Sequence, residues 1–242
     1  MTPAPTLTDA LLGPALAADP TQPLVTYYDD ATGERIELSG TTTANWAAKT
    51  ANLLRDECDL EPGGTLAVLL PAHWQTLAVL LGGWWCGADV VSSPDGADVV
   101  CCDLDRLPAA LAAGAGVVVA LSLHSLGAGL TDLPAGVVDY ATAVRLHGDV
   151  FAPEPGAGTA GPALDSATPA EVLDTARTAA AAEGLTPGAR VLTTRDWSVH
   201  DGLVEGPLAV LAAGGSLVQC RNLDPAAEDR RAESERVTHR LG

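Results

Sequence analysis

Two stretches of the chain share one pattern of hydrophobic and polar positions. Residues 60–91 and 185–220 each open with a Leu-x-Pro-Gly turn and continue as an apolar strand. Each then passes through a helical segment, breaks at glycine and enters a second strand. The copies are about 125 residues apart, a period too long for a solenoid, so we interpret them as similar halves of one α/β architecture.

Hydrophobic periodicity also predicts the elements around the first copy. Residues 24–28 and 34–38 alternate apolar and polar side chains on either side of a turn, which is typical of a β-hairpin. Apolar residues three and four apart predict a helix over 42–57 that packs one face on a sheet. The remaining elements predicted before residue 150 are helices at about 7–16, 74–86 and 107–113 and strands at about 65–70, 88–92, 98–102, 116–121 and 137–140.

A capping box marks the start of a helix in the later part of the chain. Thr168 and Glu171 flank a proline, so the hydroxyl and the carboxylate can satisfy the first free N–H groups of a helix over 169–183. Asp224 before a proline predicts the start of a last helix. We therefore divide the chain into a first α/β half with an N-terminal hairpin at 1–150, a Gly/Pro-rich loop at 151–167 and a second, partial α/β half at 168–242.

The charge of the chain excludes two classes of partner. Its formal net charge is −18, whereas nucleic acids and anionic membranes require a basic face. Arg35 is the only basic residue among the first 48, and no apolar run reaches the roughly 18 residues that span a bilayer. We expect a soluble, cytoplasmic protein that binds neither nucleic acid nor membrane.

The cysteines predict buried thiols rather than disulfides. There are five, an odd number, and Cys101 and Cys102 are adjacent, which is unfavourable for a regular bridge. Four of the five lie in or beside apolar segments, so we expect free thiols without a metal or redox role.

A glycine-rich segment is the clearest candidate for a binding loop. Gly156, Gly158 and Gly161, with Thr159 between them, match the spacing G-x-G-x-x-G. No strand precedes the match and Pro162 follows it directly, so a flexible linker is the favoured interpretation. A residual anion-binding loop remains the alternative.

The order and spacing of these elements resemble the front half of the adenylate-forming, AMP-binding superfamily, which includes acyl-CoA synthetases. The resemblance covers residues 24–222 and rests on the hairpin, the helix after it, and the segments LEPGGTLAVLLPAHWQTLAVLLGGWWCGADVV and LTPGARVLTTRDWSVHDGLVEGPLAVLAAGGSLVQC. It implies an α/β fold of two pseudo-symmetric parallel-sheet layers flanked by helices, as in the N-terminal domain of those enzymes. It also implies that His200 and Gly202 correspond to a His-x-x-Gly-type segment bordering the acyl pocket, with a spacing one residue shorter here.

The chain departs from this family where the chemistry takes place. The phosphate loop of the family is rich in Ser, Thr and Gly and ends in a lysine, whereas residues 155–164 read PGAGTAGPAL and contain no lysine. Lys49 is the only lysine of the chain and lies too early for that role or for the catalytic lysine of the family's C-terminal domain. The adenine motif, the ribose-binding aspartate and the C-terminal lid would all follow residue 222.

These departures predict a truncated, non-catalytic homologue of AMP-binding acid–CoA ligases that acts as a ligand- or protein-binding module. We expect no catalytic residue, no metal, and at most residual binding of AMP or ATP. The candidate ligand-binding residues are Gly156, Gly158, Thr159, Gly161, His200 and Gly202.

Two alternatives remain open. The chain could be one half of a split acyl-adenylating ligase that a partner chain completes. It could also form a homodimer, or bind another protein, through the surface that the missing C-terminal part would cover.

Overall fold

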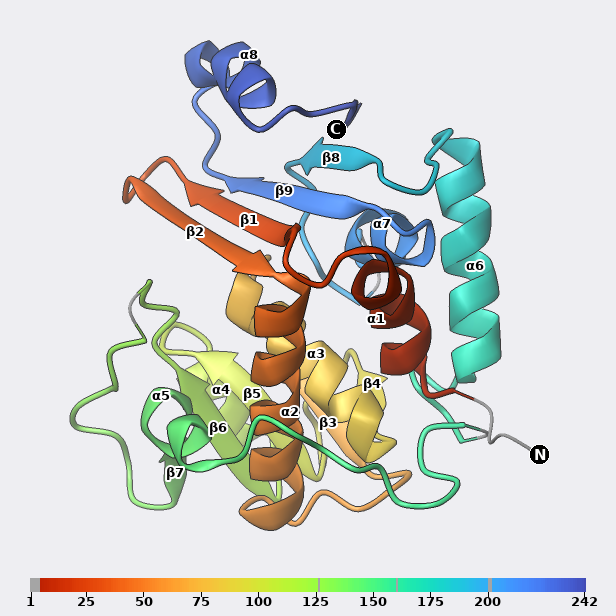
Figure 1. Ribbon diagram of the computed structural model, residues 1–242. Coiled ribbons are helices and arrows are strands. Elements are labelled where there is room, and N and C mark those ends of the chain that lie inside the picture. Colours follow the sequence, from red (N-terminus) through yellow and green to blue (C-terminus); the bar gives the residue numbers. More distant parts are fainter. Residues whose placement is uncertain (1–4, 126, 160, 200–201) are drawn as a thin grey trace.

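Two five-stranded sheets with helices between them form the core of the fold (Figure 1). The computed structural model describes residues 5–125, 127–159, 161–199 and 202–242. Sheet A has the strand order β10-β8-β9-β1-β2, and sheet B has the order β4-β3-β5-β6-β7. The α/β class and the two layers expected from the family resemblance are therefore confirmed.

Sheet A is mixed and sheet B is wholly parallel. In sheet A, β1 is antiparallel to β2 and parallel to β9, while β9, β8 and β10 run parallel to one another. The strands of sheet A are β1 (Pro23–Asp29), β2 (Glu34–Ser39), β8 (Arg190–Thr193), β9 (Ser216–Arg221) and β10 (His239–Leu241). The strands of sheet B are β3 (Thr65–Leu69), β4 (Asp89–Val91), β5 (Val99–Asp103), β6 (Val117–Leu121) and β7 (Val137–Asp139).

The internal repeat read from the sequence is present in both sheets. The first copy forms β3, helix α3 (Trp74–Cys86) and β4, and the second forms β8, a helical segment and β9. In each copy the two strands are parallel neighbours. The helix of the second copy is irregular, with a π-helical turn (Val204–Leu208) before the short α7 (Ala209–Ala212), because Pro207 lacks the N–H that a regular helix requires.

The N-terminal hairpin lies in a different sheet from the one that our division at residue 150 implies. We grouped it with residues 1–150, but β1 pairs with β9, with Val25 opposite Leu217. The hairpin therefore extends the sheet of the second half. Pairing on both sides buries β1, and Val25 and Tyr27 are each 1% exposed.

Helices α1 (Leu7–Ala18), α2 (Gly40–Asp56) and α3 fill the space between the sheets (Figure 1). Helix α3 contacts strands of both sheets, which explains why it is apolar nearly all round. A Cβ on Gly82 of α3 would lie 2.9 Å from the backbone N of Ala51, so this glycine permits α2 and α3 to pack closely.

The outer faces of the sheets carry shorter helices. Helix α8 (Pro225–Ser234) covers sheet A, where Ala232 packs with Leu192 and Val218. Helix α4 (Leu107–Ala112) covers sheet B. The other helical segments are α5 (Tyr140–Ala143), the 3-10 turn (Val144–Leu146) and α6 (Pro169–Ala182), whose predicted capping box by Thr168 and Glu171 is confirmed.

Candidate functional site

The predicted glycine-rich loop packs against the C-terminal end of α3. A Cβ on Gly158 would lie 2.7 Å from the carbonyl oxygen of Trp84 and 3.4 Å from the Cα of Gly87. The indole Nε1 of Trp84 donates a hydrogen bond of 2.7 Å to the carbonyl oxygen of Ala163, which fixes the end of the loop. Gly156 and Gly161 are exposed, and Thr159 donates to the carbonyl of Gly156.

The second group of predicted residues lies at the opposite end of α3. Gly202 has φ +91°, and a Cβ there would lie 2.2 Å from the carbonyl oxygen of Asp196. The Asp196 carboxylate accepts from the backbone N–H of Ala72, just before α3 begins. His200 lies outside the described residues.

The length of α3 therefore separates the two predicted groups. Its 13 residues correspond to roughly 20 Å at 1.5 Å per residue. The glycine-rich loop and Gly202 do not form one site in this structure.

Three carboxylates lie on or against the segment that joins the glycine-rich loop to α6, where a phosphate-binding site would need positive charge. Both oxygens of Asp89 accept from the backbone N–H of Ser166, at 3.2 and 3.1 Å, and Asp165 Oδ1 accepts from the N–H of Ser92 at 3.0 Å. At the start of α6, Glu171 accepts from the N–H of Thr168 at 2.8 Å, and this hydrogen bond lowers the pKa of its carboxyl. Acidic side chains thus occupy donors that could otherwise bind an anion.

A buried polar cluster at the start of α3 was not among the sequence-based candidates. Four of its side-chain atoms are buried and have no hydrogen-bond partner within the described part of the chain: Glu34 Oε1, His73 Nε2, Trp74 Nε1 and Gln75 Oε1. We call Glu34, His73, Trp74 and Gln75 the His73 cluster. His73 and Gln75 interrupt an otherwise apolar run in the sequence, which was the available signal.

His73 is held in one tautomer at the centre of this cluster. It caps α3, and its Nδ1 accepts from the backbone N–H of Gln75 at 3.2 Å, so the ring proton lies on Nε2. That nitrogen is 3.8 Å from Glu34 Oε1, and the ring stands edge-on to Tyr27 with centroids 4.5 Å apart. Burial lowers the pKa of His73, which keeps the ring neutral near pH 7.

The His73 cluster lies where the carboxyl ends of strands from both sheets approach each other. Strand β3 leads directly into α3, and Tyr27 belongs to the last part of β1. Open α/β sheets bind their ligands outside the carboxyl ends of the strands. The cluster places unpaired N–H donors and oxygen acceptors at this position, in side chains that are almost fully buried.

The cysteines provide no reactive thiolate. All five are free and buried, as expected, and burial raises the pKa of Cys58 and Cys86 to about 12. Among the residues that the structure describes, no group of three or more His, Cys, Asp or Glu side chains could hold a metal ion. No helix in the same ranges is long and apolar enough to cross a membrane.

Comparison of the sequence with curated proteins gives one decisive relative. The chain is 53% identical over 246 residues to a TIGR03089 family protein of Mycobacterium tuberculosis, and the match covers 100% of both chains. The chain belongs to the TIGR03089 family. No protein-family model matches this family member.

Solved structures share the fold of this family member at low sequence identity. An acyl-CoA synthetase of Brucella canis matches 98% of the chain with a TM-score of 0.79 and 18% identity. The N-terminal domain of FACL13 from Mycobacterium tuberculosis matches 96% with a TM-score of 0.71 and 16% identity. An acetoacetyl-CoA synthetase of Streptomyces lividans matches 98% with a TM-score of 0.73 and 19% identity.

The chain corresponds to only part of the length of each of these solved proteins. It covers 47%, 61% and 42% of the three chains, respectively. The resemblance to the N-terminal portion of the adenylate-forming superfamily is therefore confirmed at the level of the fold.

Proposed function

We propose that the protein is a non-catalytic binding module built on the fold of an AMP-binding ligase N-terminal domain. The observation that carries this proposal is the set of three carboxylates, Asp89, Asp165 and Glu171, that accept backbone N–H groups between the glycine-rich loop and α6 or on the adjoining strand β4. A nucleotide phosphate placed there would meet negative charge on a chain whose net charge is already −18.

The lysine that ends the phosphate loop of the adenylate-forming family has no counterpart in residues 155–164. Transfer at phosphorus depends on preorganised positive charge, which lysine, arginine or a metal ion supplies. The single lysine, Lys49, lies on α2, where its Nζ donates to the carbonyl of His147 and pairs with Asp149 at 2.6 Å. This position supports a structural role for Lys49.

ATP–pyrophosphate exchange with a panel of carboxylic acids tests the loss of catalysis. We expect no exchange above the background without enzyme. Exchange by the pure chain would overturn the proposal.

A thermal-shift titration with AMP tests the effect of these three carboxylates, because a ligand that binds the folded state raises the stability of the protein. We expect no shift for the wild type. In the double variant Asp165→Asn, Glu171→Gln the amides keep their hydrogen bonds and remove two charges, so any residual AMP binding should increase. Asp174→Asn, also exposed on α6, is the matched control and should leave AMP binding unchanged. If AMP raises the melting temperature of the wild type and the double variant shows no larger rise, the carboxylates do not oppose AMP binding.

A split ligase is the second candidate, and the partial coverage of the solved synthetases favours it. A partner chain would then supply the adenine-binding, ribose-binding and lid segments. Co-purification of this chain with a second polypeptide that restores exchange would establish this candidate.

Analytical ultracentrifugation of the pure chain tests the third possibility, a homodimer. A monomeric mass at micromolar concentration would exclude the homodimer.

A further inference from the structure

The amino ends of three sheet A strands border an open cavity of about 410 Å³. It lies where β1, β8 and β9 begin, between the C-terminal ends of α1 and α8. A volume of this size falls within the range of small-molecule sites. We call it the amino-edge cavity. It lies at the amino ends of the sheet A strands, whereas the His73 cluster lies at their carboxyl ends.

One wall of the amino-edge cavity is apolar. Ala15 and Ala18 contribute from the last turns of α1, and Pro23 and Leu24 contribute from the start of β1. These side chains offer a surface for a short hydrocarbon chain but no hydrogen-bonding group.

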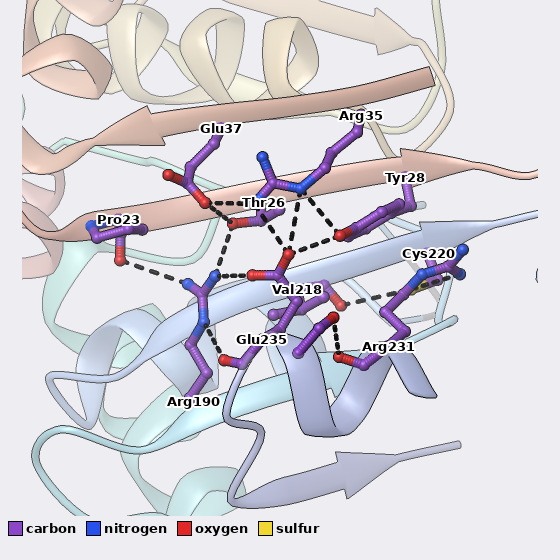
Figure 2. A network of polar contacts seen from close by, with 11 residues as sticks. Pro23, Thr26, Tyr28, Arg35, Glu37, Arg190, Val218, Cys220, Arg231 and Glu235 are labelled. Carbon is purple, nitrogen blue, oxygen red and sulfur yellow. Dashed lines mark hydrogen bonds and ion pairs between the residues drawn. The ribbon is translucent and has the colours of Figure 1, made fainter. Parts of the chain in front are cut away.

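The opposite wall includes part of a network of polar contacts, which Figure 2 shows from close by. Arg190 pairs with Glu235 at 2.9 Å and donates to Thr26 at 2.6 Å. Glu235 also accepts from the hydroxyl of Tyr28 at 2.6 Å and from Arg35 at 2.9 Å. Every charge in this network therefore has a partner.

The charges around the cavity balance once Arg35 is counted, because Arg35 pairs with Glu37 and Glu235 from outside the lining. Three lining carboxylates (Asp19, Glu37 and Glu235) face two lining guanidinium groups (Arg190 and Arg236). The C-terminal ends of α1 and α8 add their negative dipole ends.

Asp19 is the lining carboxylate that lacks a cationic partner among the described residues. Glu37 pairs with Arg35, and Glu235 pairs with Arg35 and Arg190. Asp19 accepts only from the neutral groups of Thr21 and Gln22, which orient its carboxylate and lower its pKa. It is therefore ionised at neutral pH and free to pair with a ligand.

We propose that the amino-edge cavity binds a small aliphatic amine, with the ammonium group at Asp19 and the hydrocarbon chain against Ala15, Ala18 and Leu24. This inference names a ligand class for the binding role proposed above, on a surface distinct from the glycine-rich loop. A carboxylate placed at the same position would be repelled by Asp19 and by the C-terminal end of α1.

Isothermal titration calorimetry with pentane-1,5-diamine tests this site, with glutarate as the anion of equal length. The titration is run at pH 7 and 0.15 M salt, so that weak association with the acidic surface is screened. We expect saturable one-site binding of the diamine and none of glutarate. Binding of glutarate in preference to the diamine, or no saturable binding at all, would overturn the proposal.

Three variants locate the binding. Asp19→Asn should weaken binding of the diamine at least tenfold. Ala18→Leu fills the cavity without changing its charge and should weaken binding to the same extent. Asp229→Asn removes a charge from a side chain that is 92% exposed on α8 and should have no effect. Equal affinities for Asp19→Asn and Asp229→Asn would show that the diamine binds elsewhere on the acidic surface. Because pyrophosphate exchange is measured separately, failure of this site leaves the proposed loss of catalysis standing.

Discussion

The two edges of sheet A are built in opposite ways. At the carboxyl edge, His73, Trp74 and Gln75 are at most 4% exposed and fill the space before α3 with neutral polar side chains. At the amino edge, the strands begin around a cavity of about 410 Å³ that the C-terminal ends of α1 and α8 border. The general rule that α/β sheets bind ligands at their carboxyl edge thus points to the packed edge of this sheet rather than the hollow one.

The turns that precede β8 and β9 explain why the amino-edge cavity is open. Gly188 and Gly214, which lead toward β8 and β9, have φ +82° and +73°, a region that favours glycine. The N–H of Gly188 donates to the carbonyl of Gly214 at 2.9 Å, which joins the two turns. Because neither residue has a side chain, the space in front of the strands stays open.

The largest effect should come from the polar wall of the amino-edge cavity. Glu235→Gln removes a carboxylate that is 8% exposed and leaves Arg190, 13% exposed, without its ion-pair partner. We expect a loss of about 3 kcal/mol in the free energy of unfolding, measured with urea at pH 7. Glu37→Gln, at a pair whose side chains are 45% and 36% exposed, is the control and should cost less than about 1 kcal/mol.

The difference in stability between the wild type and Glu235→Gln should shrink at acid pH. Burial disfavours the Glu235 carboxylate, but hydrogen bonds from Tyr28, Arg35 and Arg190 outweigh burial and lower its pKa from 4.5. A lowered folded-state pKa gives stability that is fully present above the unfolded-state value and is lost as the pH falls through the folded-state value. As the pH falls below 4.5 toward 2, the wild type should therefore approach Glu235→Gln in stability, and a constant difference down to pH 2 would contradict this role.

A pair of matched substitutions tests the contrast between packed and hollow edges directly. Ala72 lies before α3, is 3% exposed and donates its N–H to Asp196, so Ala72→Leu should overpack the carboxyl edge and cost about 2 kcal/mol. Ala18→Leu enters the cavity and should change stability by less than about 0.5 kcal/mol. Equal costs in urea unfolding would mean that the amino edge is as tightly packed as the carboxyl edge.

Local signals in the sequence predicted most elements of the fold. The capping box of α6 and the two Leu-x-Pro-Gly turns depend on residues within a few positions of one another, and the elements form as expected. The sheet of the hairpin was not predicted, because pairing of Val25 with Leu217 joins segments about 190 residues apart, and periodicity carries no information on such pairs.

The sites were predicted less well for the same reason. The glycine pattern identified a loop but not its place at the far end of α3 from Gly202. The amino-edge cavity draws on the ends of α1 and α8 and the starts of three strands, none of which carries a motif. His73 was visible only as a polar residue within an apolar run, a signal that does not distinguish a buried cap from a binding residue.

Among the three substitutions expected to destabilise the fold, that of His73 should have the smallest effect, and its pH dependence tests whether water reaches the packed edge. Burial lowers the pKa of His73 below its ordinary value of 6.5, so the unfolded chain binds a proton more readily than the folded chain. His73 therefore makes stability fall as the pH decreases through 6.5. His73→Asn retains an acceptor for the N–H of Gln75 but does not titrate, and it should cost about 1 kcal/mol at pH 7.5 through the lost ring contact with Tyr27.

Between pH 7.5 and 5.5, the urea midpoint of His73→Asn should fall less than that of the wild type. His239→Asn, at a partly exposed position on β10, should follow the wild type across the same range. If His73→Asn also follows the wild type, then His73 exchanges protons freely in the folded state. The carboxyl edge of sheet A would then admit water, and the contrast with the amino edge would rest on shape alone.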